Sequence, residues 1–315
     1  MSIFRSWTAL SAARKLRDPY SEMTPSRLEV RINRMAFKDI LLQLSSYPNV
    51  APASAIEQCV AIAALLQSNI TALTFAFDIE VPGTIVPFGF FDIGSLIDAE
   101  RDKSAANARL GLDAFAAMAA RRGVVHDQIC ELCTTARIPG AVIEHARLRD
   151  LTIIPAEDPA GFQQYIAECV IFGSGRPVLV VPAKPSRNSQ ALDAIGIAWD
   201  FSRPAARAIA DAMPILQAAR TVRAVTVTHE KSIETRRSGQ DLARHLTLHG
   251  VTLIFDEEDA AGRPIGQALE SYADKHGLDL LIMGAYGHWR MRDFFLGGAT
   301  KSVVANPTLP IFLSH

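Results

Sequence analysis

The sequence predicts an α/β protein built from two tandem parallel-sheet domains, each with about five strands and four helices. Short apolar runs typical of buried strands alternate with longer segments in which apolar residues recur at helical spacing. The same order of elements occurs twice, on either side of a linker rich in Pro, Ser and Asn at 185–190. Strands that alternate with crossover helices form parallel sheets with right-handed connections, and the sequence therefore favours a duplicated α/β unit.

The first series of elements starts close to Met35. Ser54 is expected to cap the first helix with its hydroxyl, and Gly123 is expected to end a long alanine-rich helix. The expected strands are 37–44, 70–77, 124–130, 151–154 and 177–181, and the expected helices are 54–67, 95–122, 135–148 and 162–172.

The second series repeats this order to the end of the chain. Gly250 and Gly277 are expected to stop two of its helices. The expected strands are 194–198, 221–228, 251–255, 278–283 and 309–313, and the expected helices are 203–219, 236–249, 264–276 and 300–305.

Composition limits the classes of function. The chain has 315 residues, of which 49% are hydrophobic, so it can form two separate cores. A net charge of −1 provides no field that would attract nucleic acid, and no apolar run approaches the ~20 residues of a membrane span. The four cysteines lie mostly among apolar residues, which indicates buried, reduced thiols and a cytoplasmic protein.

The chain divides into three parts by composition. Residues 1–34 carry seven basic and three acidic residues, a net charge of +4, and are expected to form a poorly ordered tail. A first domain is expected at 35–184 and a second at 191–315.

A spaced-glycine motif is the clearest pointer to chemistry. Gly284 and Gly287 follow an apolar strand, and nine residues separate Gly287 from a second group that precedes the expected last helix: Gly297, Gly298, Ala299 and Thr300. Glycines let backbone N–H groups approach an anion, and the start of a helix offers free N–H groups and the positive end of the helix dipole. The spacing therefore predicts a phosphate-binding loop.

Other known motifs fit less well. A P-loop requires Gly before its Lys-Ser pair, but here Thr300 precedes Lys301 and Ser302. Cys130 and Cys133 lack the second Cys-x2-Cys pair of a common zinc site, and Cys130 ends an expected apolar strand, where a buried thiol is ordinary.

The Gly-x2-Gly-x9-Gly motif after a buried strand resembles that of the universal stress protein family, and the duplication resembles its tandem members. The segment from Ala198 to Ser202 is similar to the end of the family's first strand. The resemblance implies two αβα domains of the adenine-nucleotide α-hydrolase-like type, packed as an intramolecular pseudo-dimer. It further implies that Asp200 binds the adenosine end of ATP, that Val227 offers backbone groups to adenine, and that a loop wraps ribose and phosphates. The residues of that loop are Gly284, Gly287, Gly297, Gly298, Ala299 and Thr300.

Two departures from the family pattern matter. Gly298 stands where the family usually has Ser or Thr, so a hydroxyl for phosphate is missing there. The first domain lacks the spaced glycines and has Glu157 and Asp158 where phosphate would lie, and like charges repel. We therefore expect one nucleotide per chain, in the second domain, with the first domain serving as a packing partner.

Three functions remain open at this point. The first is a regulatory stress-response protein that binds ATP or a related adenine nucleotide, with Mg²⁺ bridging the phosphates. The second is an interaction protein without a nucleotide. The third is a slow ATPase, or an enzyme that phosphorylates its own Thr300 or Ser302, although no general base stands in the loop. A protein partner of unknown identity and a homodimer are expected partners.

Overall fold

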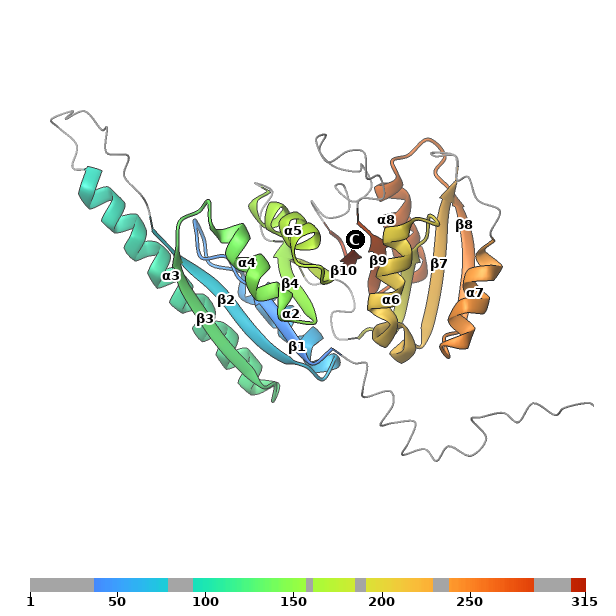
Figure 1. Cartoon of the computed structure of the whole chain (residues 1–315), viewed down its shortest axis with the longest axis horizontal. Helices are drawn as coiled ribbons and strands as arrows, with labels where there is room; N and C mark the ends of the chain where they lie inside the picture. Colours follow the sequence, from blue (N-terminus) through green and yellow to red (C-terminus); the bar gives the residue numbers. More distant parts are fainter. Residues whose placement is uncertain (1–36, 79–92, 157–160, 185–190, 229–237, 286–306) are drawn as a thin grey trace, which may run out of the picture. The chain divides into compact units, whose positions relative to one another are not determined.

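The computed structural model describes residues 37–78, 93–156, 161–184, 191–228, 238–285 and 307–315. It confirms the α/β class and the repeated order of strands and helices (Figure 1). Phe37–His315 forms a compact unit. The expected tail at 1–34 and the expected helix at 300–305 lie outside the described residues.

The described residues of the first half of the compact unit form five strands and four helices. The strands are β1 (Asp39–Gln43), β2 (Asn69–Phe77), β3 (His126–Cys133), β4 (Leu151–Ala156) and β5 (Val178–Pro182). The helices are α2 (Ala53–Leu65), α3 (Ile93–Arg121), α4 (Ile138–Arg147) and α5 (Phe162–Gly173).

The second half repeats the pattern. Its strands are β6 (Ala194–Ala198), β7 (Thr221–Thr228), β8 (Leu253–Asp259), β9 (Leu280–Gly284) and β10 (Ile311–Ser314). Its described helices are α6 (Arg203–Ala218), α7 (Gly239–Leu248) and α8 (Ile265–His276).

Two expectations about local structure were wrong. The first helix begins at Ala53, Pro52 occupies the N-cap position, and the Ser54 hydroxyl instead donates to the Ala183 carbonyl at 3.4 Å. β3 and β8 extend three or four residues beyond the apolar runs that predicted them. Both are edge strands, and an edge strand accepts polar residues because part of its surface faces water.

The strands form one ten-stranded sheet in the order β3-β2-β1-β4-β5-β10-β9-β6-β7-β8. Within each half all described neighbours are parallel, and the halves meet where β5 and β10 pair antiparallel, with Ile311 opposite Val180. Each half therefore has its own switch point, between β1 and β4 and between β6 and β9, where successive crossover connections run in opposite directions along the sheet.

Matching hydrogen bonds confirm the duplication at the level of single residues. The Asp150 carboxylate accepts two backbone N–H groups at the start of β1, at 2.8 and 3.1 Å, and the Asp279 carboxylate accepts two at the start of β6, both at 2.9 Å. Thr74 and Thr226 each donate a hydroxyl to the carbonyl of the residue that follows β1 or β6, at 3.1 and 2.8 Å. The same device thus fixes the first strand of both halves.

Two apolar clusters cover the faces of the sheet. One contains side chains of α2, α3, α6 and α7, such as Phe115 and Ile209, and the other contains side chains of α4, α5 and α8, such as Val170 and Leu269. Each half is therefore an αβα sandwich with its strands buried between helices. Among the helices of the described residues, none combines the length and the apolar character that crossing a bilayer would require.

Candidate functional site

The switch point of the second half brings together the predicted site residues that the structure describes. Gly284 is the last residue of β9, Asp200 is the second residue after β6, and Val227 is the penultimate residue of β7. β6 lies between β9 and β7, with Ala198 opposite both Met283 and Val225. In open parallel sheets, ligands bind outside the carboxyl ends of the strands at such a point.

The remaining predicted site residues cannot be located in the same way. Gly287, Gly297, Gly298, Ala299 and Thr300 lie outside the described residues.

Val227 presents backbone groups that the sheet does not use. The Val225 carbonyl accepts a hydrogen bond from Trp199 N–H at 2.9 Å, on the β6 side of β7. Backbone groups two residues apart on a strand point to the same side, so those of Val227 also point toward β6. β6 ends at Ala198, and the chain turns away into α6. The N–H and C=O of Val227 therefore have no described strand opposite them and can pair with the edge of a flat ligand.

Asp200 already has a structural role. It is exposed, and its Oδ1 accepts the N–H of Ser202 at 3.0 Å across Phe201, which has a φ of +60°. Ser202 is the N-cap of α6 and accepts the N–H of Ala205 at 3.2 Å. The carboxylate thus orders the start of α6 through one oxygen. Its other oxygen has no hydrogen bond to a described residue and can accept one from a ligand hydroxyl or amino group.

Gly284 is required by packing, whatever its role toward a ligand. A Cβ at this position would lie 2.3 Å from the Ala205 nitrogen and 2.5 Å from the Pro204 carbonyl carbon. The start of α6 therefore packs directly on the end of β9, which no feature of the sequence had indicated.

The first half differs from the second at the corresponding positions. The strand registers match, so that Ser45 corresponds to Asp200 and Pro155 to Gly284. Neither a carboxylate nor a glycine is present there. Glu157 and Asp158, which were expected to repel phosphate, lie outside the described residues. That the first half does not bind a nucleotide in the same manner stays a prediction.

The Cys130–Cys133 pair does not form a chelating site. Residues three apart on a strand point to opposite faces, so Cys130 and Cys133 point away from each other. The expectation of a buried Cys130 was wrong, since this thiol is exposed on edge strand β3, whereas Cys133 is buried. Burial raises the pKa of the Cys133 thiol, which disfavours its thiolate. Within the described ranges no group of three or more His, Cys, Asp or Glu residues could hold a metal ion.

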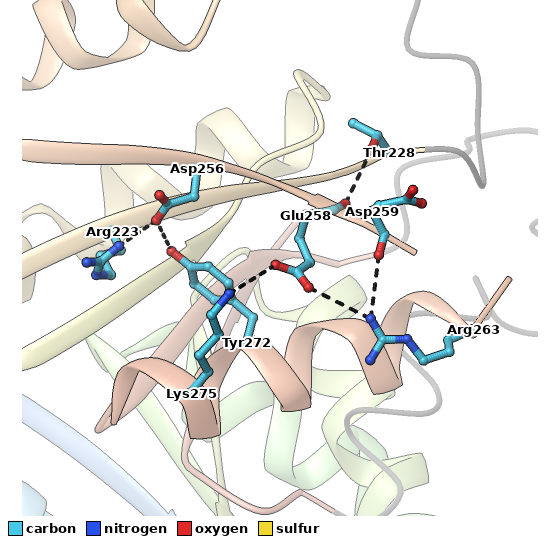
Figure 2. A network of polar contacts seen from close by, with 8 residues as sticks. All are labelled: Arg223, Thr228, Asp256, Glu258, Asp259, Arg263, Tyr272 and Lys275. Atoms are coloured by element: carbon cyan, nitrogen blue, oxygen red, sulfur yellow. Dashed lines mark hydrogen bonds and ion pairs between the residues drawn. The ribbon is translucent and has the colours of Figure 1, made fainter. Parts of the chain in front are cut away.

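A network of polar side chains joins β7 and β8 to α8 (Figure 2). Asp256 Oδ2 accepts a hydrogen bond from Arg223 Nη1 at 2.6 Å and another from the Tyr272 hydroxyl. Burial favours the neutral acid, but the hydrogen bonds from Tyr272 and Arg223 outweigh it and hold the pKa of Asp256 below its usual value. The network therefore links both strands to α8. In the sequence, its only signal is a charged residue within each of the two strands, Arg223 in β7 and Asp256 in β8.

Glu258 extends this network toward Val227, which lies opposite it in the sheet. Its carboxylate is 3.8 Å from Arg263 and 3.9 Å from Lys275 (Figure 2). Arg263 Nε also donates to the Ala260 carbonyl at 3.2 Å. Long, partly exposed ion pairs contribute little free energy. We therefore expect them to add little to the stability of the connection from β8 to α8.

Tyr272 makes the free energy of unfolding depend on pH in alkaline solution. Burial, with the hydrogen bond to Asp256, raises its pKa from 10.0 to about 12. The folded state therefore binds the phenolic proton more tightly than the unfolded state, and this stabilisation is lost as the pH rises. We expect the free energy of unfolding to fall by about 1.4 kcal/mol per pH unit between pH 10 and pH 12, relative to Tyr272→Phe. Urea denaturation of both proteins measures this difference, and parallel pH profiles would contradict it.

Comparison with known proteins identifies the fold. Neither a protein-family model nor a curated protein matches the sequence. Among solved structures, a universal stress protein from Archaeoglobus fulgidus DSM 4304 aligns with a TM-score of 0.62 at 16% identity, covering 87% of this chain and 95% of that one.

Two Pseudomonas aeruginosa proteins align over a similar extent. A putative universal stress protein from strain UCBPP-PA14 and a functionally unknown protein from strain PAO1 each have a TM-score of 0.53 at 14% identity, covering 90% of this chain and 94% of theirs. The described chain therefore has the fold of the universal stress proteins, present twice in one polypeptide, as its glycine motif and duplication had predicted.

Proposed function

We propose that the second half of the chain, residues 191–315, binds ATP or a related adenine nucleotide and that binding serves regulation and not catalysis. The observation that carries the proposal is the convergence of three features at one switch point. They are Asp200, the backbone groups of Val227, which face no described strand, and the end of β9. A carboxylate, an unpaired backbone edge and a glycine-bearing strand end are complementary to ribose, adenine and phosphate.

Each group has a defined part in the proposed complex. The free oxygen of Asp200 accepts a ribose hydroxyl or the adenine amino group, and the N–H and C=O of Val227 pair with the adenine edge. The proposed phosphate ligands are the backbone amides of the glycine motif, from Gly284 and Gly287 to Gly297, Gly298, Ala299 and Thr300. If Mg²⁺ takes part, it bridges phosphate oxygens.

A nucleotide-free interaction protein is the competing function. Gly298, which stands in place of a hydroxyl residue, and the first half, which lacks the motif, favour it. An enzymatic function would require a base near Thr300 or Ser302, and both residues lie outside the described ranges. An Arabidopsis thaliana universal stress protein was solved with AMP bound, and from it we take only AMP as a second ligand to test.

Asp200→Asn separates ligand binding from helix capping. Asparagine can still accept the Ser202 N–H, so the unfolding free energy should stay within about 0.5 kcal/mol of wild type. The loss of a charged acceptor should weaken ATP binding about tenfold. The matched control, Ser202→Ala, removes the α6 cap and should lower stability by about 1 kcal/mol without changing affinity.

Fluorescence or calorimetric titration with ATP and AMP, together with urea denaturation, distinguishes these outcomes. An Asp200→Asn protein that binds as tightly as wild type would show that the carboxylate is only a capping group. The proposed ribose or adenine contact would then be wrong.

A further inference from the structure

The end of β9, where the glycine motif begins, is held by the last two residues of the chain. Ser314 lies opposite Gly284 in the parallel β9–β10 pair, and its carbonyl accepts the Ala285 N–H at 2.8 Å. His315 Nδ1 lies 2.9 Å from the Ala285 carbonyl oxygen. A carbonyl can only accept, so Nδ1 carries the proton in this contact. Both backbone groups of the fully buried Ala285 are therefore engaged.

The other side of His315 contacts the first half of the chain. Its ring packs on Phe172 in a T-shaped arrangement, with centroids 4.9 Å apart and an interplanar angle of 68°. Phe172 lies in the last turn of α5, and β5 begins shortly after it at Val178. Val178 pairs antiparallel with Leu313, so the sheet itself brings the end of α5 to the end of β10.

The same chain end is also tied to α6. The Ser314 hydroxyl donates to Asp211 Oδ2 at 2.5 Å, and that oxygen also accepts from Arg207 Nε at 2.8 Å. α6 begins against Gly284. The end of β9 is thus held by the strand β10 and by the start of α6. The ring of His315 also connects it to α5.

We propose that His315 is a positioning residue through which the first half regulates the proposed nucleotide site of the second. Its ring contacts Phe172, and its Nδ1–H holds the Ala285 carbonyl at the start of the glycine motif. A partner or ligand that displaces α5 changes the end of β9 and with it the affinity for nucleotide. By thermodynamic reciprocity, a bound nucleotide alters the Phe172 contact to the same extent. The affinity part of this proposal rests on the proposed function.

Three substitutions separate the two contacts of His315. His315→Asn keeps an N–H donor for Ala285 and removes the ring, whereas His315→Phe keeps a ring for Phe172 and removes the donor. Phe172→Ala removes the ring partner from the first half. Leu132→Ala is the control, because Leu132 is an exposed leucine of the first half on the distant edge strand β3.

Two measurements are made on the full chain. Hydrogen exchange of the 280–285 amides without nucleotide reports the end of β9, and titration with ATP reports affinity. His315→Phe should raise exchange and weaken binding about fivefold, as expected for one lost hydrogen bond. Phe172→Ala and His315→Asn should each have about a threefold effect. Their double variant should be no worse than either alone, because both remove the same ring contact.

The proposal would be overturned if Phe172→Ala and Leu132→Ala showed the same hydrogen exchange at 280–285. It would also be overturned if the effects of Phe172→Ala and His315→Asn added up in the double variant. If wild type fails to bind ATP or AMP while Phe172→Ala still raises exchange at 280–285, the proposed function is wrong and the link through His315 stands. The two proposals can therefore fail separately.

Discussion

Replacing Gly284 with alanine is expected to lower the free energy of unfolding by about 3 kcal/mol, at the upper end of the usual cost of overpacking. The new methyl group would lie 2.3 Å from the Ala205 nitrogen and 2.5 Å from the Pro204 carbonyl carbon. These atoms belong to the backbone at the start of α6 and cannot rotate away as a side chain could. Urea denaturation at neutral pH measures the change.

Gly140→Ala provides the matched control for this substitution. Gly140 lies inside α4, and a Cβ there would have no neighbour within 4 Å. Alanine favours a helix over glycine by about 1 kcal/mol, so this variant should be as stable as wild type or more stable. Similar losses at both positions would contradict the close packing of β9 on α6. A stable Gly284→Ala protein that fails to bind nucleotide would instead favour a direct role in the site.

Replacing Asp256 with alanine is expected to lower the free energy of unfolding by about 2–3 kcal/mol. The substitution leaves the Arg223 guanidinium and the buried Tyr272 hydroxyl without their shared acceptor. Arg223 is partly exposed, so water compensates in part and the loss stays below that of a fully buried ion pair.

Comparison with two further variants checks this network. Tyr272→Phe should cost about 1 kcal/mol, because Asp256 keeps its bond to Arg223. Lys275→Ala removes an exposed partner 3.9 Å from Glu258 and should change stability by less than about 0.5 kcal/mol. Equal losses for Asp256→Ala and Lys275→Ala would mean that the buried part of the network contributes no more than a surface ion pair.

Local sequence patterns predicted the fold because the type and order of the elements depend on hydrophobic periodicity and on residues that end helices. Gly277 is an example, since it lies at the C-cap of α8 with a φ of +60°. The same patterns misjudged the edge strands, since β3 and β8 carry polar residues that end an apolar run before the strand ends. They also favoured Ser54 as a cap, although Pro52 holds that position.

The candidate site was only partly predictable. Asp200 and Val227 could be named from the resemblance, because their places follow from the strands that they terminate. The packing of Gly284 on α6 and the bridge from His315 to Phe172 could not, because each joins segments that are distant in sequence. Such contacts depend on strand register, and above all on the antiparallel pairing of β5 with β10, which no local pattern encodes.

Isothermal titration of ATP into the purified 315-residue chain tests the central claim most directly. The account predicts saturable binding of one nucleotide per chain at sub-millimolar concentrations. It also predicts that Gly287→Val abolishes this heat without changing the unfolding free energy, because a side chain there keeps phosphate from the backbone amides. Absence of saturable heat in the wild-type protein, or unchanged affinity in Gly287→Val, would contradict it.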